Sequence, residues 1–186
     1  GNLPVAEYLL GCGADIHFQS PKGYSILLNT VFALHDNERL VPMIEFLIRH
    51  GANSNSASEY GESPLSVASR LGSFYAVRYL LEIGTDPSPL RWTEFMRAVA
   101  IGTCDDVTKL LSDKSVLDER DRWDRTPWLL SIVAKDSEKA KLLLAAGANI
   151  NDQDRRGQSA LMYCASTGVT SMLRWLIEAG ADVEAT

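Results

Sequence analysis

Apolar residues recur along the chain in short stripes with helical spacing, and a glycine closes most of these stripes. The last stripe shows the pattern clearly, because Met172, Leu173, Leu176 and Ile177 fall on one helical face and lead into Gly180. Glycine adopts the left-handed backbone conformation at little cost, so it commonly follows the last turn of a helix. The pattern therefore predicts an α-helix that ends just before each of these glycines.

The stripes repeat with a period near 33 residues. Gly-Ala-Asp or Gly-Ala-Asn closes four of them, and a weaker copy closes a fifth: Gly13, Gly51, Gly147, Gly180 and, weaker, Gly84. A hydroxyl residue opens an apolar run earlier in each complete period: Ser25, Ser63, Thr93, Thr126 and Ser159. The steps between the last four of these are 30, 33 and 33 residues. A fixed period of this length indicates a stack of one supersecondary unit.

The local chemistry of one period predicts two helices and two turns. In Ser63-Pro64 and Thr126-Pro127 a hydroxyl precedes a proline, which suits an N-cap and the first helical position. Glycines mark the turn between the two helices: Gly72, Gly102 and Gly168. The segment from Asp154 to Gly157 suits a tight turn that projects between one helix pair and the next.

These features resemble the ankyrin repeat family, whose unit carries Gly-x-Thr-Pro-Leu at its first helix and Leu-Leu-x-x-Gly-Ala-Asp at the end of its second. The unit from Gly157 to Asp182 and the unit that begins Gly61-Glu62-Ser63-Pro64-Leu65 match nearly every signature position. The resemblance covers essentially the whole chain and implies an all-α solenoid of stacked helix-turn-helix units with projecting turns. We expect one domain over residues 1–186, with a partial unit at 1–18 and units at about 19–56, 57–88, 89–119, 120–152 and 153–186.

The sequence departs from the family pattern in three places. The family's histidine after leucine is missing in every unit, Lys114-Ser115 replaces Gly-Ala in the fourth helix pair, and five extra residues lie between Leu34 and Val41. We expect the extra residues to form a longer loop from His35 to Leu40. Residues 1–10 indicate a turn and a second helix with no first helix before it, so we expect the chain to be a fragment of a longer array.

Charge and composition narrow the classes of function. Eighteen Lys and Arg against 24 Asp and Glu give a formal charge of -6, which opposes general attraction to nucleic acid or to anionic membranes. The apolar stretches are too short to span a bilayer, and the start lacks the layout of a signal peptide. Three cysteines without metal-ligand spacing favour a reducing compartment, and we expect a cytoplasmic protein.

The cysteine, histidine and tryptophan residues of the sequence indicate packing rather than catalysis. Carboxylates follow Cys104 directly and no histidine lies near it in the sequence, which opposes an activated thiolate, and Cys164 stands where the family has a small core alanine. The three histidines are scattered, and we find no phosphate loop or nucleophile elbow. We expect no enzyme activity, no metal and no cofactor. Trp128 and Trp175 occupy positions that the family fills with core residues.

The resemblance also implies where a partner would bind. In the family, ligands are mostly held by the projecting turns and by the inner side of the first helix. The matching positions are Lys22, Tyr24, Phe32, Glu59, Tyr60, Glu62, Arg70, Leu90, Trp92, Arg122, Trp123, Arg125, Arg155, Arg156 and Gln158. Tyr, Trp and Arg dominate interface energetics, at about 2 kcal/mol or more each when central and desolvated. The acidic members come early and most of the arginines late, so a partner with acidic groups opposite the last two units would be steered in register.

The residues leave several functions open. The leading hypothesis is a non-catalytic module, monomeric by itself, that binds a protein partner on its concave face. Its alternatives are a bacterial immunity-type protein that neutralises a cognate toxin and a targeting segment of a larger enzyme or effector. A further hypothesis, nucleic-acid binding through the patch from Arg122 to Arg156, predicts affinity that falls steeply with salt.

Overall fold

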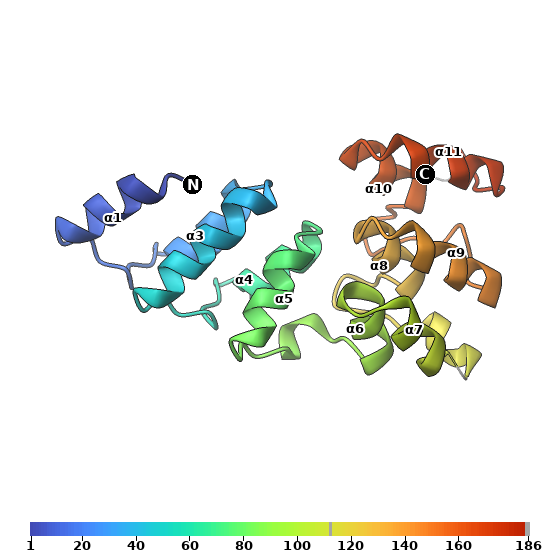
Figure 1. The fold of residues 1–186 in the computed structure, drawn as a ribbon, viewed down its shortest axis with the longest axis horizontal. Helices are drawn as coiled ribbons and strands as arrows, with labels where there is room; N and C mark the ends of the chain where they lie inside the picture. The colour runs from blue at the N-terminus through green and yellow to red at the C-terminus, as the bar shows by residue number, and fades with distance from the viewer. Residues whose placement is uncertain (112, 185–186) are drawn as a thin grey trace. The chain divides into compact units, whose positions relative to one another are not determined.

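The computed structural model describes residues 1–111 and 113–184. Within these ranges the chain forms eleven α-helices and two short 3-10 helices. The only strand-like pairing among the described residues is two isolated bridges, Gln19 with Ser25 and Gln153 with Ser159. The expected all-α repeat architecture is confirmed. The chain divides into two compact units, unit 1 at residues 1–90 and unit 2 at residues 91–186, and each consists of helix pairs joined by turns (Figure 1).

Unit 1 begins with a lone helix followed by two helix pairs. Its elements are α1 (Leu3–Gly11), α2 (Ile26–Ala33), α3 (Asn37–Arg49), α4 (Pro64–Arg70), α5 (Phe74–Glu82) and the 3-10 helix η1 (Ser88–Leu90). Helix α2 packs against α3 and α4, and α5 packs against α3 and α4. The core of this unit lies between these four helices, where Leu27, Ile44, Leu65 and Leu80 have no exposed surface.

Unit 2 contains three helix pairs. Its elements are α6 (Glu94–Ile101), α7 (Cys104–Leu110), the 3-10 helix η2 (Lys114–Asp118), α8 (Pro127–Val133), α9 (Ser137–Ala146), α10 (Ala160–Thr167) and α11 (Thr170–Glu178). Helix α8 is central, because it packs against α6, α9 and α10. Trp128 on α8 is fully buried, as expected for a core residue. The half-buried Trp175 packs on it, with ring centroids 6.1 Å apart.

The hydroxyl residues that open each period are helix caps. The side chains of Ser25, Ser63, Thr93, Thr126 and Ser159 each accept a hydrogen bond from the amide three residues later, at 3.1 to 3.5 Å. Pro64 and Pro127 stand at the first helical position, where a missing N–H costs nothing. Such a cap stabilises a helix by about 0.5–2 kcal/mol, so the caps define where the first helix of every pair begins.

Glycine is required in the turns for two different physical reasons. Gly180 has φ of +90°, and Gly168 has φ of +71°, so both take the left-handed conformation that favours glycine. Gly102 has a negative φ and is needed for a close approach instead. A Cβ atom there would lie 2.8 Å from the carbonyl oxygen and 2.9 Å from the Cα atom of Ala98, so a larger residue would clash with the last turn of α6.

The expected long loop from His35 to Leu40 is wrong. Helix α3 begins at Asn37, and its 13 residues make it longer than any other helix that the structure describes. Asp36 caps this helix by accepting a bond from the amide of Glu38 at 2.9 Å, and Leu40 is fully buried. The extra residues therefore add a helical turn, because a capped turn that buries a leucine is more favourable than a solvated loop.

Candidate functional site

The projecting turns have one backbone design in four of the repeats. A main-chain hydrogen bond closes each turn, from the amide of Ser20, Ser58, Asp121 and Asp154 to the carbonyl oxygen four residues later, at 2.9 to 3.1 Å. The residue before the last of these five has positive φ: Gly23, Gly61, Asp124 and Gly157. The flanking side chains, which include most of the predicted contact residues, are therefore held at set positions in each turn.

Adjacent turns within a unit are linked through their main chains. The amide of Glu59 donates to the carbonyl oxygen of Lys22 at 3.0 Å in unit 1. The amide of Arg155 donates to the carbonyl oxygen of Trp123 at 3.1 Å in unit 2. The side chains at the tips of consecutive turns are thus spaced by backbone hydrogen bonds and not by flexible contacts alone.

In unit 1 four side chains form one connected cluster, which we call the Arg70 cluster: Tyr24, Phe32, Glu62 and Arg70. The Tyr24 hydroxyl donates to Glu62 Oε2 at 3.1 Å, and Arg70 Nη2 lies 3.6 Å from Glu62 Oε1. The Arg70 guanidinium also lies over the Phe32 ring, 5.4 Å from its centroid. Desolvation, together with the hydrogen bond to the Glu62 carboxylate and its negative charge, raises the pKa of Tyr24.

At the turn tips of unit 1 the side chains are more exposed. Lys22 Nζ lies 5.8 Å from the centroid of the Tyr60 ring, and 61% of Tyr60 is exposed. Glu59 is exposed beside them. The tips therefore offer an aromatic ring with both signs of charge, while the Arg70 cluster lies half-buried behind them.

In unit 2 the turn that carries Trp123 is held by a buried ion pair. Arg125 Nε and Nη2 donate to Asp121 Oδ2 at 2.8 and 2.6 Å, and both side chains are at most 1% exposed. Asp121 Oδ1 accepts from the amides of Trp123 and Arg125 at 2.8 and 3.0 Å. The Arg122 guanidinium lies over the Trp123 ring, 5.6 Å from its centroid.

The next turn of unit 2 has a similar internal support. Asp154 Oδ2 accepts from the Tyr163 hydroxyl at 2.6 Å, and Asp154 Oδ1 accepts from the amides of Arg156 and Gln158. Burial makes the largest contribution to the raised pKa of Tyr163, and the hydrogen bond to Asp154 raises this pKa further. The Arg155 and Arg156 side chains are exposed at the tip of this turn.

The predicted contact residues fall into three groups by exposure. Lys22, Glu59, Tyr60, Arg155 and Arg156 are exposed, and Tyr24, Phe32, Glu62, Arg70, Trp92, Arg122, Trp123 and Gln158 are half-buried. Leu90 and Arg125 are only 2% and 1% exposed. Leu90 lies in η1, which packs against α4, and the guanidinium of Arg125 is bonded to Asp121. These two residues support their turns from inside, so the exposed surface does not include them.

Sequence reasoning missed the side chains that support the turns of unit 2. Asp121 and Asp154 each open a turn, and Tyr163 reaches back to the second turn from α10. Arg120 also bridges the two turns, because its Nη1 donates to the carbonyl oxygens of Asp124 and Gln153 at 2.9 and 3.2 Å. The 33-residue step from Asp121 to Asp154 is the signal in the sequence that could have identified the two aspartates.

Residues 1–111 and 113–184 contain no group of three or more His, Cys, Asp or Glu side chains that could hold a metal ion. Cys164 is 2% exposed, as expected for a packing residue, and burial raises the pKa of its thiol to about 11. Among the same residues, none of the helices has the length and apolar character needed to cross a membrane.

Known proteins with similar sequences are considerably longer than this chain. B-cell lymphoma 3 protein homolog from Mus musculus is 27% identical over 168 residues, which cover 80% of the chain and 38% of that protein. Palmitoyltransferase AKR1 from Lachancea kluyveri is 30% identical over 154 residues, 78% of the chain and 21% of that protein. Ankyrin repeat and SOCS box protein 6 from Homo sapiens is 26% identical over 197 aligned positions, 98% of the chain and 45% of that protein. The chain thus spans less than half the length of each of these relatives.

A family model describes almost the entire chain. The model for ankyrin repeats (3 copies) matches residues 1–89 and again residues 95–186. These matches agree with the helix pairs, the capped first helices and the projecting turns of both units. Ankyrin repeats are generally non-enzymatic protein–protein interaction modules. The chain belongs to the ankyrin repeat family.

Proposed function

We propose that this chain is a non-catalytic module that binds a protein partner through its projecting turns and the inner sides of its first helices. The observation that carries the proposal is the way in which the turns hold aromatic and charged side chains. Trp123 is positioned by a hydrogen bond from its amide to Asp121, and a backbone bond ties its turn to that of Arg155. Preorganised side chains lose little conformational entropy on binding, which favours affinity.

The two units present different chemistry to the partner. In unit 2 the contact residues are Arg122, Trp123, Arg155, Arg156 and Gln158, together with the half-buried Trp92. The Asp154 carboxylate is committed to Tyr163 and two amides, so the arginine-rich tips favour a partner with acidic groups beside an apolar anchor. In unit 1 Lys22, Glu59 and Tyr60 at the tips and the Arg70 cluster behind them suit a mixed polar and aromatic contact.

The module acts as a monomer in the cytoplasm and binds protein in preference to nucleic acid. The formal charge of -6 supports this preference, because a polyanion would be repelled at long range. The match to ankyrin repeats, which are generally non-enzymatic, supports a role without catalysis.

The experiment compares partner capture by three variants. Extract from the native source is passed over the immobilised chain, and bound proteins are identified by mass spectrometry. Trp123→Ala with Arg155→Ala should lose the partner that the unchanged chain retains. Arg155→Ala with Arg156→Ala should weaken capture without risk to the fold, because both side chains are exposed.

Arg174→Ala is the matched control, since Arg174 is an exposed arginine of the same unit that lies on α11, away from the turns. This variant should capture the partner as the unchanged chain does. Circular dichroism of all variants should show the same helix content. Undiminished capture by both double variants would refute the assignment of this surface.

A second candidate function is a binding segment of a longer enzyme or effector. The chain spans only 21% of the relative named a palmitoyltransferase and less than half of the others, and this observation favours it. The full reading frame in the source organism tests the proposal. A reading frame that encodes ankyrin repeats and nothing else would contradict this second candidate function.

A further inference from the structure

A hydroxyl residue directly precedes proline at four places in the sequence, and the structure distinguishes them. Ser63 and Thr126 are buried helix caps, 5% and 0% exposed. Ser20 is half-buried, and its Oγ accepts a main-chain hydrogen bond at 3.1 Å. Ser88 is exposed, and the basic residue Arg91 follows it by three positions. Of the four hydroxyl groups, that of Ser88 is therefore the most open to an enzyme.

The segment from Ser88 to Arg91 has the pattern of a protein kinase substrate. Proline-directed kinases modify a serine or threonine that directly precedes proline, and the cyclin-dependent kinases within this class also favour a basic residue three positions later. Kinases use such charges to select their substrates. At that position the other three pairs have Gly23, Ser66 and Leu129, none of which is charged. Exposure and the required charge thus coincide at Ser88.

The Ser88 hydroxyl is bonded to one carboxylate in the last turn of unit 1. It donates to Asp86 Oδ2 at 2.6 Å, and the amide of Ser88 donates to Asp86 Oδ1 at 2.9 Å. These two hydrogen bonds lower the pKa of Asp86, so this carboxylate is ionised at neutral pH. The amide of Leu90 donates to the carbonyl oxygen of Pro87 at 2.9 Å, and Leu90 is 2% exposed in η1, which packs against α4. A small number of contacts therefore holds η1 in place.

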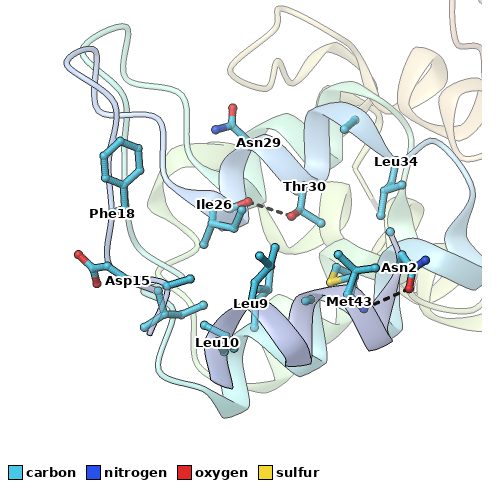
Figure 2. A pocket seen from close by; sticks show the side chains of 17 residues that line it. Asn2, Leu9, Leu10, Asp15, Phe18, Ile26, Asn29, Thr30, Leu34 and Met43 are labelled. Carbon is cyan, nitrogen blue, oxygen red and sulfur yellow. Dashed lines mark hydrogen bonds between the residues drawn. The ribbon is translucent and has the colours of Figure 1, made fainter. Parts of the chain in front are cut away.

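This short 3-10 helix can open without the loss of a larger element. It has three residues, and Arg91 directly after it has φ of +54°, a strained conformation for a residue other than glycine. Ser88 precedes a proline, which favours the extended backbone that kinases bind. By contrast, Thr30 lies within α2, where its hydroxyl donates to the carbonyl oxygen of Ile26 at 2.9 Å (Figure 2). Access to a hydroxyl in such a place would require a whole helix to unwind.

We propose that Ser88 is a phosphorylation site and that its phosphate releases η1 from α4. In the reaction, Ser88 Oγ forms a bond to the γ-phosphorus of a nucleoside triphosphate while the bond from this phosphorus to the β,γ-bridging oxygen breaks. The nucleoside diphosphate leaves, and the hydroxyl proton passes to the catalytic aspartate of the kinase. Neither Ser88 nor Arg91 is among the predicted contact residues, so the inference does not depend on the proposed function.

The surroundings of Ser88 oppose a phosphate group. The hydroxyl donor to Asp86 is lost, and about two negative charges then stand beside that carboxylate. A helix start stabilises phosphate through its free amides, but Pro89 has no N–H, and the amides of Ser88 and Leu90 are already bonded. Arg91 is exposed, so solvent weakens its attraction for the phosphate. Repulsion from Asp86 therefore dominates, and it opens the turn.

The first test incubates the full chain with a purified cyclin-dependent kinase and magnesium ATP. Peptide mapping by mass spectrometry should find phosphate on Ser88 before Ser20, Ser63 or Thr126. Arg91→Ala should lower the initial rate at Ser88 about tenfold, because the charge that the kinase selects is lost. Arg91→Lys is the matched control, and its rate should stay within a factor of about two because it keeps the charge. Equal rates at Ser88 and Ser20, or no effect of Arg91→Ala, would overturn the assignment of the site.

The second test measures the release of η1 by amide exchange in NMR spectra. In the phosphorylated chain the amides of Ser88 and Leu90 should exchange at least about tenfold faster than in the unmodified chain. Ser88→Ala is the control for the lost hydroxyl, and it should accelerate exchange less because it adds no charge.

Asp86→Asn in the phosphorylated chain should restore slow exchange. Asparagine is neutral, its carbonyl oxygen still accepts the amide of residue 88, and its NH2 group can donate to the phosphate. Unchanged or slower exchange after phosphorylation would overturn the proposed release of η1. Exchange as fast with Asp86→Asn as without it would also overturn it, because the repulsion would then not be its cause.

Discussion

The buried ion pair between Arg125 and Asp121 offers the sharpest test of how the turns of unit 2 are held. We consider Arg125→Met, which keeps an unbranched, flexible side chain and removes the charge. The Asp121 side chain has no exposed surface, so the substitution leaves a carboxylate buried without its cation. Removal of one partner of a buried pair costs about 3–5 kcal/mol.

The structure places the expected cost near the lower end of that range. Asp121 keeps two backbone donors after the substitution, the amides of Trp123 and residue 125, at 2.8 and 3.0 Å. We therefore expect the free energy of unfolding to fall by about 3 kcal/mol. With a urea dependence of about 2 kcal/mol per molar, the midpoint of unfolding falls by about 1.5 M.

Tryptophan fluorescence measures this unfolding in unit 2 alone. All four tryptophans, Trp92, Trp123, Trp128 and Trp175, lie within residues 91–186, the range of that unit. The double variant Asp121→Asn with Arg125→Met should recover most of the loss, because asparagine is neutral and can still accept both amide bonds. Arg155→Met is the control, since an exposed arginine changes stability by about 0.5 kcal/mol or less. A cost for Arg125→Met as small as that of the control, or a double variant no more stable than the single, would refute the reasoning.

Three further predictions concern the core, the phenol and the thiols. Leu143→Ala or Leu176→Ala, at residues with no exposed surface, should destabilise unit 2 by about 2–5 kcal/mol in urea unfolding, whereas Ile177→Ala, at a residue that is 50% exposed, should cost much less. The pKa of Tyr163 is raised in the folded state, so Tyr163 stabilises the fold below the ordinary tyrosine pKa of about 10, and this stabilisation is lost as the pH rises above 10. Unfolding midpoints measured from pH 8 to 11 should therefore fall less for Tyr163→Phe than for the unchanged chain. Cys12 is exposed and Cys164 is buried with its thiol pKa raised to about 11, so a thiol reagent at pH 8 should modify Cys12 quickly and Cys164 only after denaturant is added, as peptide mapping by mass spectrometry would show. Equal modification of the two cysteines in the native chain would contradict the burial of Cys164.

Much of the repeat can be predicted from the sequence because its signals are local. A hydroxyl residue followed by an apolar run caps a helix wherever the backbone is free to form one, and Ser63 and Thr126 do so in the structure. The burial of Trp128 agrees with the family resemblance, because Trp128 occupies a position that the family fills with a core residue. The loop expected from His35 to Leu40 shows the limit of this reasoning. Whether extra residues loop out or extend a helix depends on the buried site that Leu40 occupies, and that site belongs to other segments.

The sequence by itself determined the helix pairs, their caps and the turns that join them, since these features depend on residues close together in the chain. Only the tertiary structure decided which side chains of the turns are available to a partner. Arg125 and Arg155 are both turn arginines in the sequence, yet the first is 1% exposed and paired with Asp121, while the second is exposed. Burial and pairing depend on neighbours brought together by folding, and these neighbours are absent from any local pattern of residues.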